Sequence, residues 1–521
     1  MTTVWATIVT TVVLASAGLF PAVALIGLRL ITVPMVPLAG AVIAAMSATC
    51  FIAVGGSFIW WFVGLAVAGV GGVAACWALR PEWRPGHPRG GRRHRGDHRR
   101  VQKRTPGVAV AVGGLAVLGS SVWCLRGLAT PTVGFDARAL WLARAGWFLQ
   151  SHQQLLVKMR VHDVVLVQSV YPPLVSASTA VAWRITGDQS MRLGVVVIAI
   201  LNTCALVAAA YALIEAGRQV TTRLVAGQMH DEAGPTGMAI VGSPLLPMAV
   251  GVVSATLLVF IAFGICEPFM TNGYADPIWA LAAVGAVAYG LQLGINRTNQ
   301  GVALILLLVA GMSKDEGVIT ALGLIALIAV RRLATMSAEE RRRRWTRPVL
   351  IGMAEVAAVG AWPVLMRIIH ARGETSASFS SLHSWPARAR IAYDGMAPYL
   401  HVIVLAACLA VVGGVILARV RRRSGMANDC WAWAGLVCGL LAVTGAYVTG
   451  TADLHVWLVG TVDRVTEFAA LAGWWMVAMW AVVASAAPAA GNRSMGIGSV
   501  TGSEVACPAD PIPSAVGVAA E

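Results

Sequence analysis

Residues 301–330 read GVALILLLVAGMSKDEGVITALGLIALIAV, two apolar runs on either side of the charged residues Lys314, Asp315 and Glu316. A helix needs about 20 apolar residues to cross a hydrocarbon core roughly 30 Å thick. Both runs are shorter than this, so the charges would lie slightly inside the apolar zone, where an unpaired ion costs roughly 2.5–3.5 kcal/mol. We expect them to pair or to bind something, and three adjacent charges favour binding over a self-contained Lys–Glu turn.

Apolar runs of this kind recur along the chain. Of its 521 residues, 58% are apolar and 12% are charged, whereas soluble proteins carry roughly 25% charged residues. Water-soluble enzyme folds are therefore excluded, and we predict an all-α polytopic membrane protein with about thirteen transmembrane helices. The runs lie near residues 3–27, 32–53, 56–79, 107–128, 192–216, 237–264, 277–295, 299–312, 317–330, 349–367, 397–418, 430–449 and 466–486.

The basic residues predict the orientation of the chain. One set of segments holds 26 of the 39 Lys and Arg, and a bias of this kind marks the cytoplasmic side. The N-terminus would lie outside a bacterial plasma membrane, the C-terminus would be cytoplasmic, and residues 174–186, too short to cross, would lie on the outer face. The charges form short blocks between apolar runs, which excludes nucleic acid as a partner. The segments assigned to the inside are Arg29, residues 80–104, 218–232, 297, 331–347 and 419–429, and the C-terminal tail.

The chain divides into four regions. Residues 1–79 form an N-terminal module of three spans, and residues 80–106 form a basic cytoplasmic linker suited to anionic lipid. Residues 107–486 form the transmembrane core. The tail, residues 487–521, is rich in Gly, Ser, Pro and Ala and is predicted to be disordered.

The first outer segment is GFDARALWLARAGWFL, residues 134–149. It predicts an interfacial helix. Asp136 precedes this helix, so it is open to two interpretations, an N-cap that accepts backbone hydrogen bonds and a catalytic carboxylate. In this helix Leu140, Trp141, Leu142, Trp147 and Phe148 would face the membrane, with Arg138 and Arg144 as polar anchors.

Three further outer segments carry polar residues. A helix start preset by two prolines follows Tyr171. In CEPFMTNGYADP, residues 266–277, a turn at Asn272-Gly273 and a helix start at Asp276-Pro277 are the structural explanations. The last outer loop, residues 449–468, contains Arg464, which could grip a phosphate or snorkel to the interface. The candidate site residues of the segment 266–277 include the acids Glu267 and Asp276 and the aromatic Tyr274. The last loop adds His455, although a single histidine in such a place is more often an interface residue than a base or a ligand.

Taken in order, these segments resemble motifs of the GT-C glycosyltransferases, polytopic enzymes that take sugar from a polyprenyl-phosphate carrier. The resemblance covers roughly residues 107–486 and is closest to the bacterial mannosyltransferase-like branch. It implies a GT-C-like bundle with interfacial helices in the first large outer loop. The last loop departs from the pattern, since His455 and Trp457 are displaced and Thr461 stands where Ser is usual; Asn272 stands where an acid is common. The matching segments are Asp136 before ARALW, YPPL at 171–174, GYADP at 273–277, KDEG at 314–317 and Asp453 to Arg464.

The resemblance implies a transfer of hexose or pentose, with inversion, to a hydroxyl of an envelope glycan, lipid or protein. Asp136 would be the base, and Lys314 and Arg464 would neutralise the departing phosphate. No cofactor is certain, but a divalent cation could be shared by Asp136, Glu267 and Asp276. The remaining substrate-binding residues would be Arg138, Tyr171, Glu267, Asn272, Tyr274, Asp276, Asp315, Glu316 and His455.

Other functions compete with this one. A flippase or transporter of lipid-linked sugars would need charges at the bilayer midplane on broken helices and an internal repeat, and the sequence shows neither. An O-antigen-type ligase or polymerase would be favoured by paired arginines in a large outer loop, and Arg388 and Arg390 are a faint hint of them. A structural membrane protein would explain the spans but not the acids.

Overall fold

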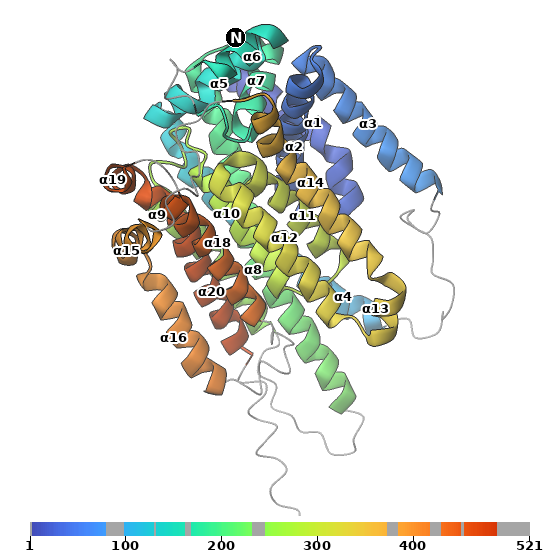
Figure 1. Cartoon of the computed structure of the whole chain (residues 1–521). Helices are drawn as coiled ribbons and strands as arrows, with labels where there is room; N and C mark the ends of the chain where they lie inside the picture. Colours follow the sequence, from blue (N-terminus) through green and yellow to red (C-terminus); the bar gives the residue numbers. More distant parts are fainter. Residues whose placement is uncertain are drawn as a thin grey trace, which may run out of the picture.

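The computed structural model describes residues 3–79, 98–129, 132–161, 168–231, 245–371, 384–416, 429–449 and 453–486. Throughout these ranges the regular secondary structure is helical, without a strand, which confirms the predicted all-α class (Figure 1). The tail, residues 487–521, and residues 80–97 of the predicted linker lie outside the described residues. Helix α4 (His98–Cys124) begins within the segment predicted to be linker.

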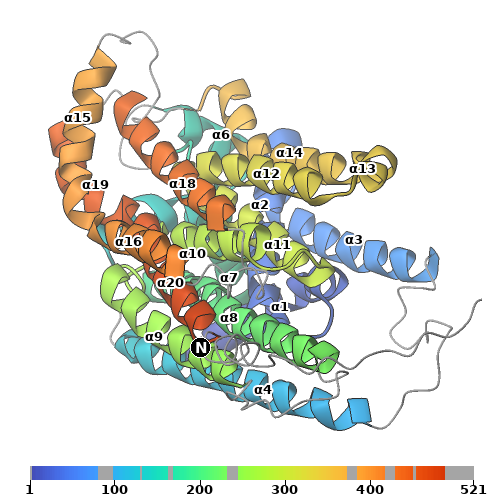
Figure 2. The same ribbon diagram turned by 90° about the horizontal axis from the view of Figure 1, so that it is seen from below.

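The helices fall into two groups by their direction. Most run along a common axis, and a smaller set of short helices lies at the two ends of the bundle or across it (Figures 1 and 2). The long group comprises α1 (Thr3–Ile26), α2 (Thr32–Val54), α3 (Phe58–Leu79), α4, α8 (Met191–Asp231), α9 (Leu246–Cys266), α10 (Asp276–Val287), α11 (Arg297–Ser313), α12 (Asp315–Thr335), α14 (Thr346–Ile368), α16 (His401–Ile416), α18 (Asp429–Thr449) and α20 (Glu467–Ala484). The short group comprises η2 (Leu125–Ala129), η3 (Ala137–Leu142), α5 (Ala143–Phe148), α6 (His152–Arg160), α7 (Leu174–Thr186), η5 (Ala288–Gln292), α13 (Ala338–Arg344), α15 (Trp385–Met396), η7 (Ala397–Tyr399) and α19 (Leu454–Val465).

Within the described residues, eight helices are long and apolar enough to cross a membrane. A ninth is added if the pair Trp385–Tyr399 and His401–Val412, bent by 74°, counts as one span. The predicted count of about thirteen is not confirmed. Predicted spans near 277–295 and 299–312 are shorter helices, 12 residues in α10 before a π-helical turn and 17 in α11, and α7, with 13 residues, is also too short to be a candidate.

Helices α1 and α2, which belong to the predicted N-terminal module, pack within the bundle. Glycine lets their backbones approach closely, since a Cβ at Gly18 would clash with the carbonyl of Val36 and one at Gly40 with that of Leu14. Small residues at such contacts are the usual means of close packing between membrane helices. The second helix also packs on α7, α8 and α11, whereas α3 lies at the edge (Figure 2).

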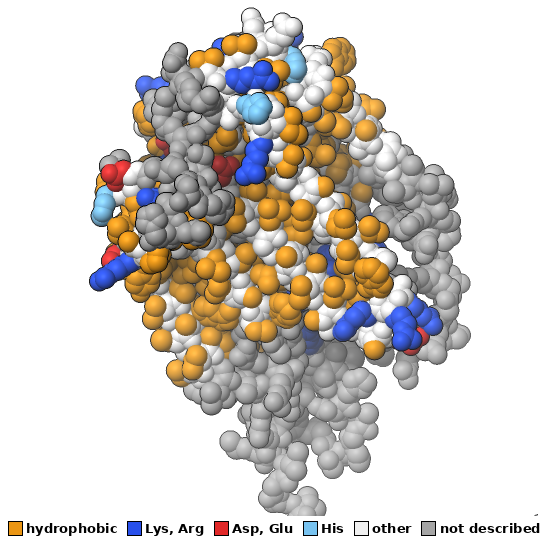
Figure 3. Space-filling model, viewed as in Figure 1, with side chains coloured by type: hydrophobic (Ala, Val, Ile, Leu, Met, Phe, Trp, Pro, Cys, Tyr) orange, Lys and Arg blue, Asp and Glu red, His pale blue; other side chains and the backbone are white. Residues whose placement is uncertain are grey.

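The outer surface of the bundle is apolar. Large side chains on several helices are exposed where a soluble protein would bury them, and Figure 3 shows a broad orange surface between sparser charged groups. A bilayer accounts for this surface, since lipid tails are as apolar as the side chains. Examples are Trp60, Leu115, Leu350, Val411 and Leu441.

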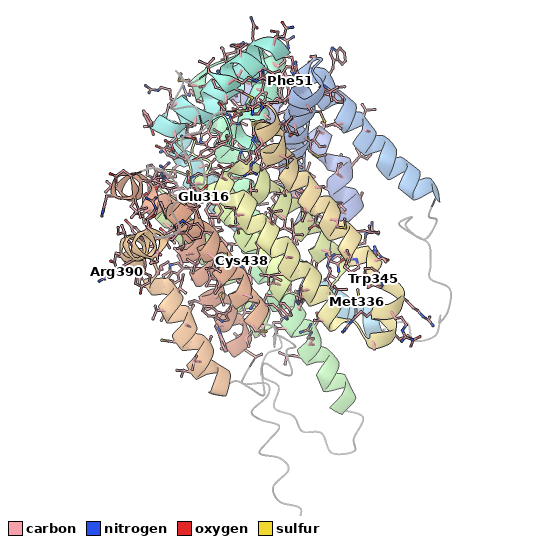
Figure 4. The ribbon with its side chains drawn as sticks, viewed as in Figure 1. Phe51, Glu316, Met336, Trp345, Arg390 and Cys438 are labelled. Atoms are coloured by element: carbon pink, nitrogen blue, oxygen red, sulfur yellow. The ribbon has the colours of Figure 1, made fainter. Side chains whose placement is uncertain are left out.

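The two ends of the bundle differ in composition. Figure 4 shows Glu316 towards the end that carries α5, α6 and α7, with Met336 and Trp345 at the other end, beside the arginine-rich α13. Arg297 donates a hydrogen bond to the carbonyl of Ala24 at 2.6 Å, which joins the start of α11 to the end of α1. These positions agree with the predicted grouping of the basic segments at one end. We call the opposite end the site end.

Helices α15 and α19 lie across the bundle axis. They are seen end-on in Figure 1 and lengthwise, side by side, in Figure 2. The sequence analysis assigned most of α19 to the last outer loop, and within that segment Leu454–Val465 forms three turns of helix. The consequence for the site is that Arg464 projects from the last turn of a helix lying across the bundle.

Candidate functional site

Asp136 is positioned by a close backbone contact. The amide of Gly134 donates to the carbonyl of Asn272 at 2.9 Å, and a Cβ at Gly134 would clash with the ring of Tyr274. Glycine is therefore required where the two segments touch. Asp136 makes no capping hydrogen bond at the start of η3, so the N-cap interpretation is wrong and its carboxylate is free to act elsewhere.

The segment that receives this contact is itself held from α8. The side-chain amide of Asn202 donates to the carbonyls of Met270 and Tyr274, at 3.1 and 3.5 Å. Gly273 has a φ of +92°, a left-handed backbone that suits glycine. Asp276 then begins α10 without capping it. These contacts fix the backbone on either side of Tyr274 and direct Asp276 into the bundle.

Lys314 occupies the break between α11 and α12. Its backbone is extended, and a Cβ at Gly317 would clash with the carbonyl of Ala310, so glycine permits the tight reversal. The Nζ of Lys314 lies 2.5 Å from Oδ1 of Asp276 and 3.5 Å from Oε1 of Glu316. The self-contained Lys–Glu turn is therefore only the weaker part of this arrangement.

Arg464 completes the cluster from α19. Its Nη1 forms an ion pair with Oδ2 of Asp136 and lies 3.7 Å from Oδ2 of Asp276, while Nη2 donates to the carbonyl of Gly460. The guanidinium carbon lies 4.9 Å from the centre of the Tyr274 ring, within the range of a cation–π interaction. The result is a continuous row of charges, Asp136–Arg464–Asp276–Lys314–Glu316, which we call the charge row.

Apart from the partly exposed Asp136, the charge row is buried, and pairing favours the charged forms of Asp276 and Lys314. Burial alone would raise the pKa of Asp276, but Lys314 and Arg464 together hold it below its ordinary value. Burial would likewise lower the pKa of Lys314, and Asp276 and Glu316 raise it instead. Taking such ions from water is costly, and removing one partner leaves an uncompensated buried charge. The arrangement is thus expensive to keep, which favours a functional role over a purely structural one.

Glu467 is a buried acid that the sequence analysis missed. It begins α20, is 1% exposed, and interacts electrostatically with Asp276, Lys314 and Arg464. The carboxyl lies beside the Cys266 thiol, and within the described structure neither oxygen has a hydrogen bond of ordinary geometry. The sequence did contain a signal for Glu467, because an acid at the start of an apolar span is a candidate functional residue.

Several residues predicted for the site lie elsewhere. The side chains of Arg138, Glu267 and His455 are exposed, and the His455 amide donates to the side chain of Asp453. Asn272 takes part through its backbone carbonyl. No group of three or more His, Cys, Asp or Glu side chains in the described ranges is arranged to hold a metal ion, so the carboxylates suggested for a shared cation are not gathered.

The segment 134–149 was predicted to face lipid, and this is wrong. Leu140, Trp141 and Phe148 are buried in the protein beneath α7 and α8, as are Leu142 and Trp147. Arg144, expected to anchor at the surface, is 1% exposed. An apolar stripe shows that a face is covered, but it does not distinguish lipid from neighbouring helices.

The paired arginines of α15 do not form a common site. Arg388 donates to the carbonyls of Tyr447 and Val448, at 2.9 and 3.1 Å, and so attaches α15 to the end of α18. Arg390 projects from the outer side of α15 in Figure 4. The two arginines that hinted at an O-antigen-type ligase therefore do not act as a pair.

The assembled site is a buried row of two cations and three carboxylates at one end of a membrane bundle, with Tyr171 and Tyr274 beside it. In comparisons with protein-family models, curated proteins and solved structures, the chain matches none.

Proposed function

We propose that the protein is a membrane glycosyltransferase that moves a sugar from a polyprenyl-phosphate carrier to a hydroxyl of an envelope acceptor. The observation that carries the proposal is the ion pair between Asp136 and Arg464, which lie 328 residues apart in the chain. Such a transfer needs a carboxylate to take the hydroxyl proton and cations to stabilise the departing phosphate. The charge row offers both a carboxylate and cations at the site end of the bundle.

Phosphate binding would rearrange the charge row. Arg464 now pairs with Asp136, and Lys314 with Asp276. A phosphate between the cations would compete with these carboxylates, since a guanidinium binds phosphate as well as it binds carboxylate. As Arg464 turns to the phosphate, Asp136 loses its partner and becomes a better proton acceptor. Donor binding would therefore switch the base on.

In the chemical step the acceptor oxygen attacks the anomeric carbon. Its proton passes to a carboxylate oxygen of Asp136, and the bond between the anomeric carbon and the phosphate oxygen breaks. The electron pair of that bond leaves with polyprenyl phosphate, whose charge Lys314 and Arg464 neutralise. A single displacement of this kind inverts the anomeric centre, through an oxocarbenium-like state.

Asp136 suits the role of base better than Asp276. The Asp136 side chain is 19% exposed and that of Asp276 is 1% exposed, so Asp136 is the more accessible of the two carboxylates to an acceptor. Asp276 also lies between both cations. We assign Asp276 to holding Lys314 and Arg464 in place, and Tyr274 and Glu316 to contacts with sugar or acceptor hydroxyls.

The sidedness of the bundle supports an extracytoplasmic reaction. The arginine-rich α13 lies at the end opposite the charge row, and basic segments mark the cytoplasmic side. The site end would then face outwards from a bacterial plasma membrane, with the N-terminus outside and the C-terminus inside. Lipid-linked donor and envelope acceptor would meet there.

The test is transfer by membranes that carry the full chain, supplied with radiolabelled polyprenyl-phosphate sugars and envelope acceptors. We expect Asp136→Asn to lose at least about a hundredfold of the activity, the usual contribution of a catalytic base. The control is Asp394→Asn, because Asp394 is an exposed acid on α15. Undiminished transfer by Asp136→Asn would reject the base, and labelled donor that crosses sealed vesicles unconsumed would show a flippase instead.

A further inference from the structure

A second buried cation lies next to the charge row but outside it. Arg144, on α5, donates from Nη2 to the carbonyl of Tyr171 at 2.5 Å, and its Nε and Nη1 have no hydrogen-bond partner among the described residues. Burial lowers the pKa of Arg144 to about 10, with Asp315 and Tyr171 opposing the shift, so it is a cation at neutral pH. Buried donors without partners are costly, and the bond to Tyr171 leaves Nε and Nη1 of Arg144 without a structural use.

Asp315 faces this arginine. It follows Lys314 in the chain, but Lys314 reaches towards Asp276 whereas Asp315 interacts electrostatically with Arg144. No ion pair joins Arg144 and Asp315 within the described contacts. Arg144 and Asp315 therefore lie near each other without a direct ion pair, an arrangement that suits a small polar ligand bound between them.

Aromatic side chains frame the same place. Trp141 stacks on Tyr171 with ring centres 5.6 Å apart, and the guanidinium carbon of Arg144 lies 5.8 Å from the ring centre of Trp362. The indole of Trp362 donates to the carbonyl of Val170 at 2.8 Å. Two successive carbonyls are thus held by Trp362 and Arg144, so the backbone beside the site is fixed before any ligand arrives.

Tyr171 joins this place to the charge row. Its phenol interacts electrostatically with Glu316, Lys314 and Asp315. Tyr171 and Asp315 are partly exposed, as are Tyr274 and Asp136, so a ligand at the charge row can extend towards Arg144. Tyr171 therefore links Arg144 to the charge row, because its carbonyl accepts from Arg144 and its phenol interacts with Glu316 and Lys314.

We propose that Arg144 and Asp315 form a sugar-binding subsite, in which they hold hydroxyls of the donor sugar while Lys314 and Arg464 hold its phosphate. The inference rests on the proposed function and adds the part of the substrate that this place recognises. A hydroxyl accepts from Arg144 and donates to Asp315, so it satisfies both. The ionised carboxylate of Asp315 would repel a second phosphate. The flanking rings suit the apolar faces of a sugar.

The test compares a polyprenyl phosphate without a sugar with three derivatives that carry one. Full-length protein in nanodiscs is titrated with undecaprenyl phosphate and with its mannosyl, glucosyl and arabinosyl derivatives, and the ratio of the two Kd values gives the contribution of the sugar. We expect the best sugar to bind at least tenfold more tightly than bare undecaprenyl phosphate. Arg144→Gln and Asp315→Asn should bring this ratio close to one and leave the Kd for the bare phosphate unchanged, since each loses a hydrogen bond to a charged group.

Arg184→Gln is the matched control, because Arg184 is exposed on the neighbouring α7. Arg144→Lys, which keeps the charge, should recover part of the ratio. The inference is overturned if the ratio persists in Arg144→Gln, if both ligands weaken equally, or if wild type shows no preference. It is also overturned if Arg144→Gln selectively weakens undecaprenyl diphosphate. Failure of wild type to bind any of these ligands would instead reject the proposed function.

Discussion

The two ends of the bundle use buried arginine in opposite ways. At the end opposite the site, Arg331 donates to the carbonyls of Gly290 and Leu293, at 2.7 and 3.0 Å, and so closes the end of η5. At the site end, Arg464 pairs with acids from two distant segments, Asp136 and Asp276. An arginine bound only to carbonyls completes a helix end. Arg464 has one carbonyl partner, Gly460, and its other contacts are carboxylates that a ligand can replace.

The acids show the same difference. Glu215 pairs with Arg218 one turn away on α8, and Gln219 donates to Glu215, so the ionic partners of this group come from a single helix. Asp276 and Lys314 come from different helices, 38 residues apart. Side-chain oxygens at the site end also lack hydrogen-bond partners in the described structure, on Asp276 and Glu467. Complete local groups stabilise the fold, and incomplete distant ones are available for binding.

The largest expected effect separates the two arginines. Arg464→Ala should reduce transfer by about 100- to 1,000-fold, the cost of losing one donor to developing charge. Arg331→Ala should leave the turnover of folded protein unchanged and lower its thermal midpoint, because the two carbonyls lose their donor. Initial rates and unfolding temperatures of the purified proteins measure both effects. Equal rates for the two variants would remove the functional distinction between the ends.

Removing Lys314 tests the energetic side of the comparison. Lys314→Met leaves Asp276 and Glu316 buried without their shared cation, and we expect a loss of about 3–5 kcal/mol in the free energy of unfolding. Arg218→Met breaks a pair within one helix that is partly exposed, and should cost under about 1 kcal/mol. Denaturant titration in detergent gives both values.

A double variant sharpens this result. Asp276→Asn combined with Lys314→Met removes both charges of this pair and should restore part of the stability, since replacing a whole buried pair is often neutral, while Glu316 still lacks its cation. It should not restore transfer, because the phosphate would lose a cation. Recovered activity would mean that the pair serves only the fold.

The smallest effect concerns the backbone that shapes the site. Gly317→Ala places a methyl group against the carbonyl of Ala310, and we expect a loss of about 1–3 kcal/mol from overpacking. Gly360→Ala on α14 meets no atom within 4 Å and should leave the unfolding temperature equal or slightly raised, as alanine favours helix. If the two variants unfold alike, the close turn between α11 and α12 does not need glycine.

Much of the fold followed from the sequence. The all-α class comes from composition, and the start of α7 directly after Pro173 comes from proline chemistry. The number of spans did not follow, because α10 and α11 are short helices inside the bundle. Hydropathy detects apolar length but not whether lipid or protein surrounds it.

The site followed less completely. Resemblance selected Asp136, Lys314 and Arg464 from the chain, and the structure brings these three to one row. It could not show that Asp315 turns away from Lys314, because that divergence depends on the extended backbone at Lys314. Nor could it show that Arg144 is buried, since an arginine in an apolar stripe is equally compatible with an anchor at the interface.

The most direct measurement of the central claim is a double-mutant cycle on Asp136 and Arg464 in the transfer assay. If the two act as one catalytic unit, Asp136→Asn and Arg464→Gln should each lose most of the activity, and the double variant should lose little more than the worse single variant. Losses that multiply would show that the two residues act independently, and would contradict the view that this ion pair is the centre of the site.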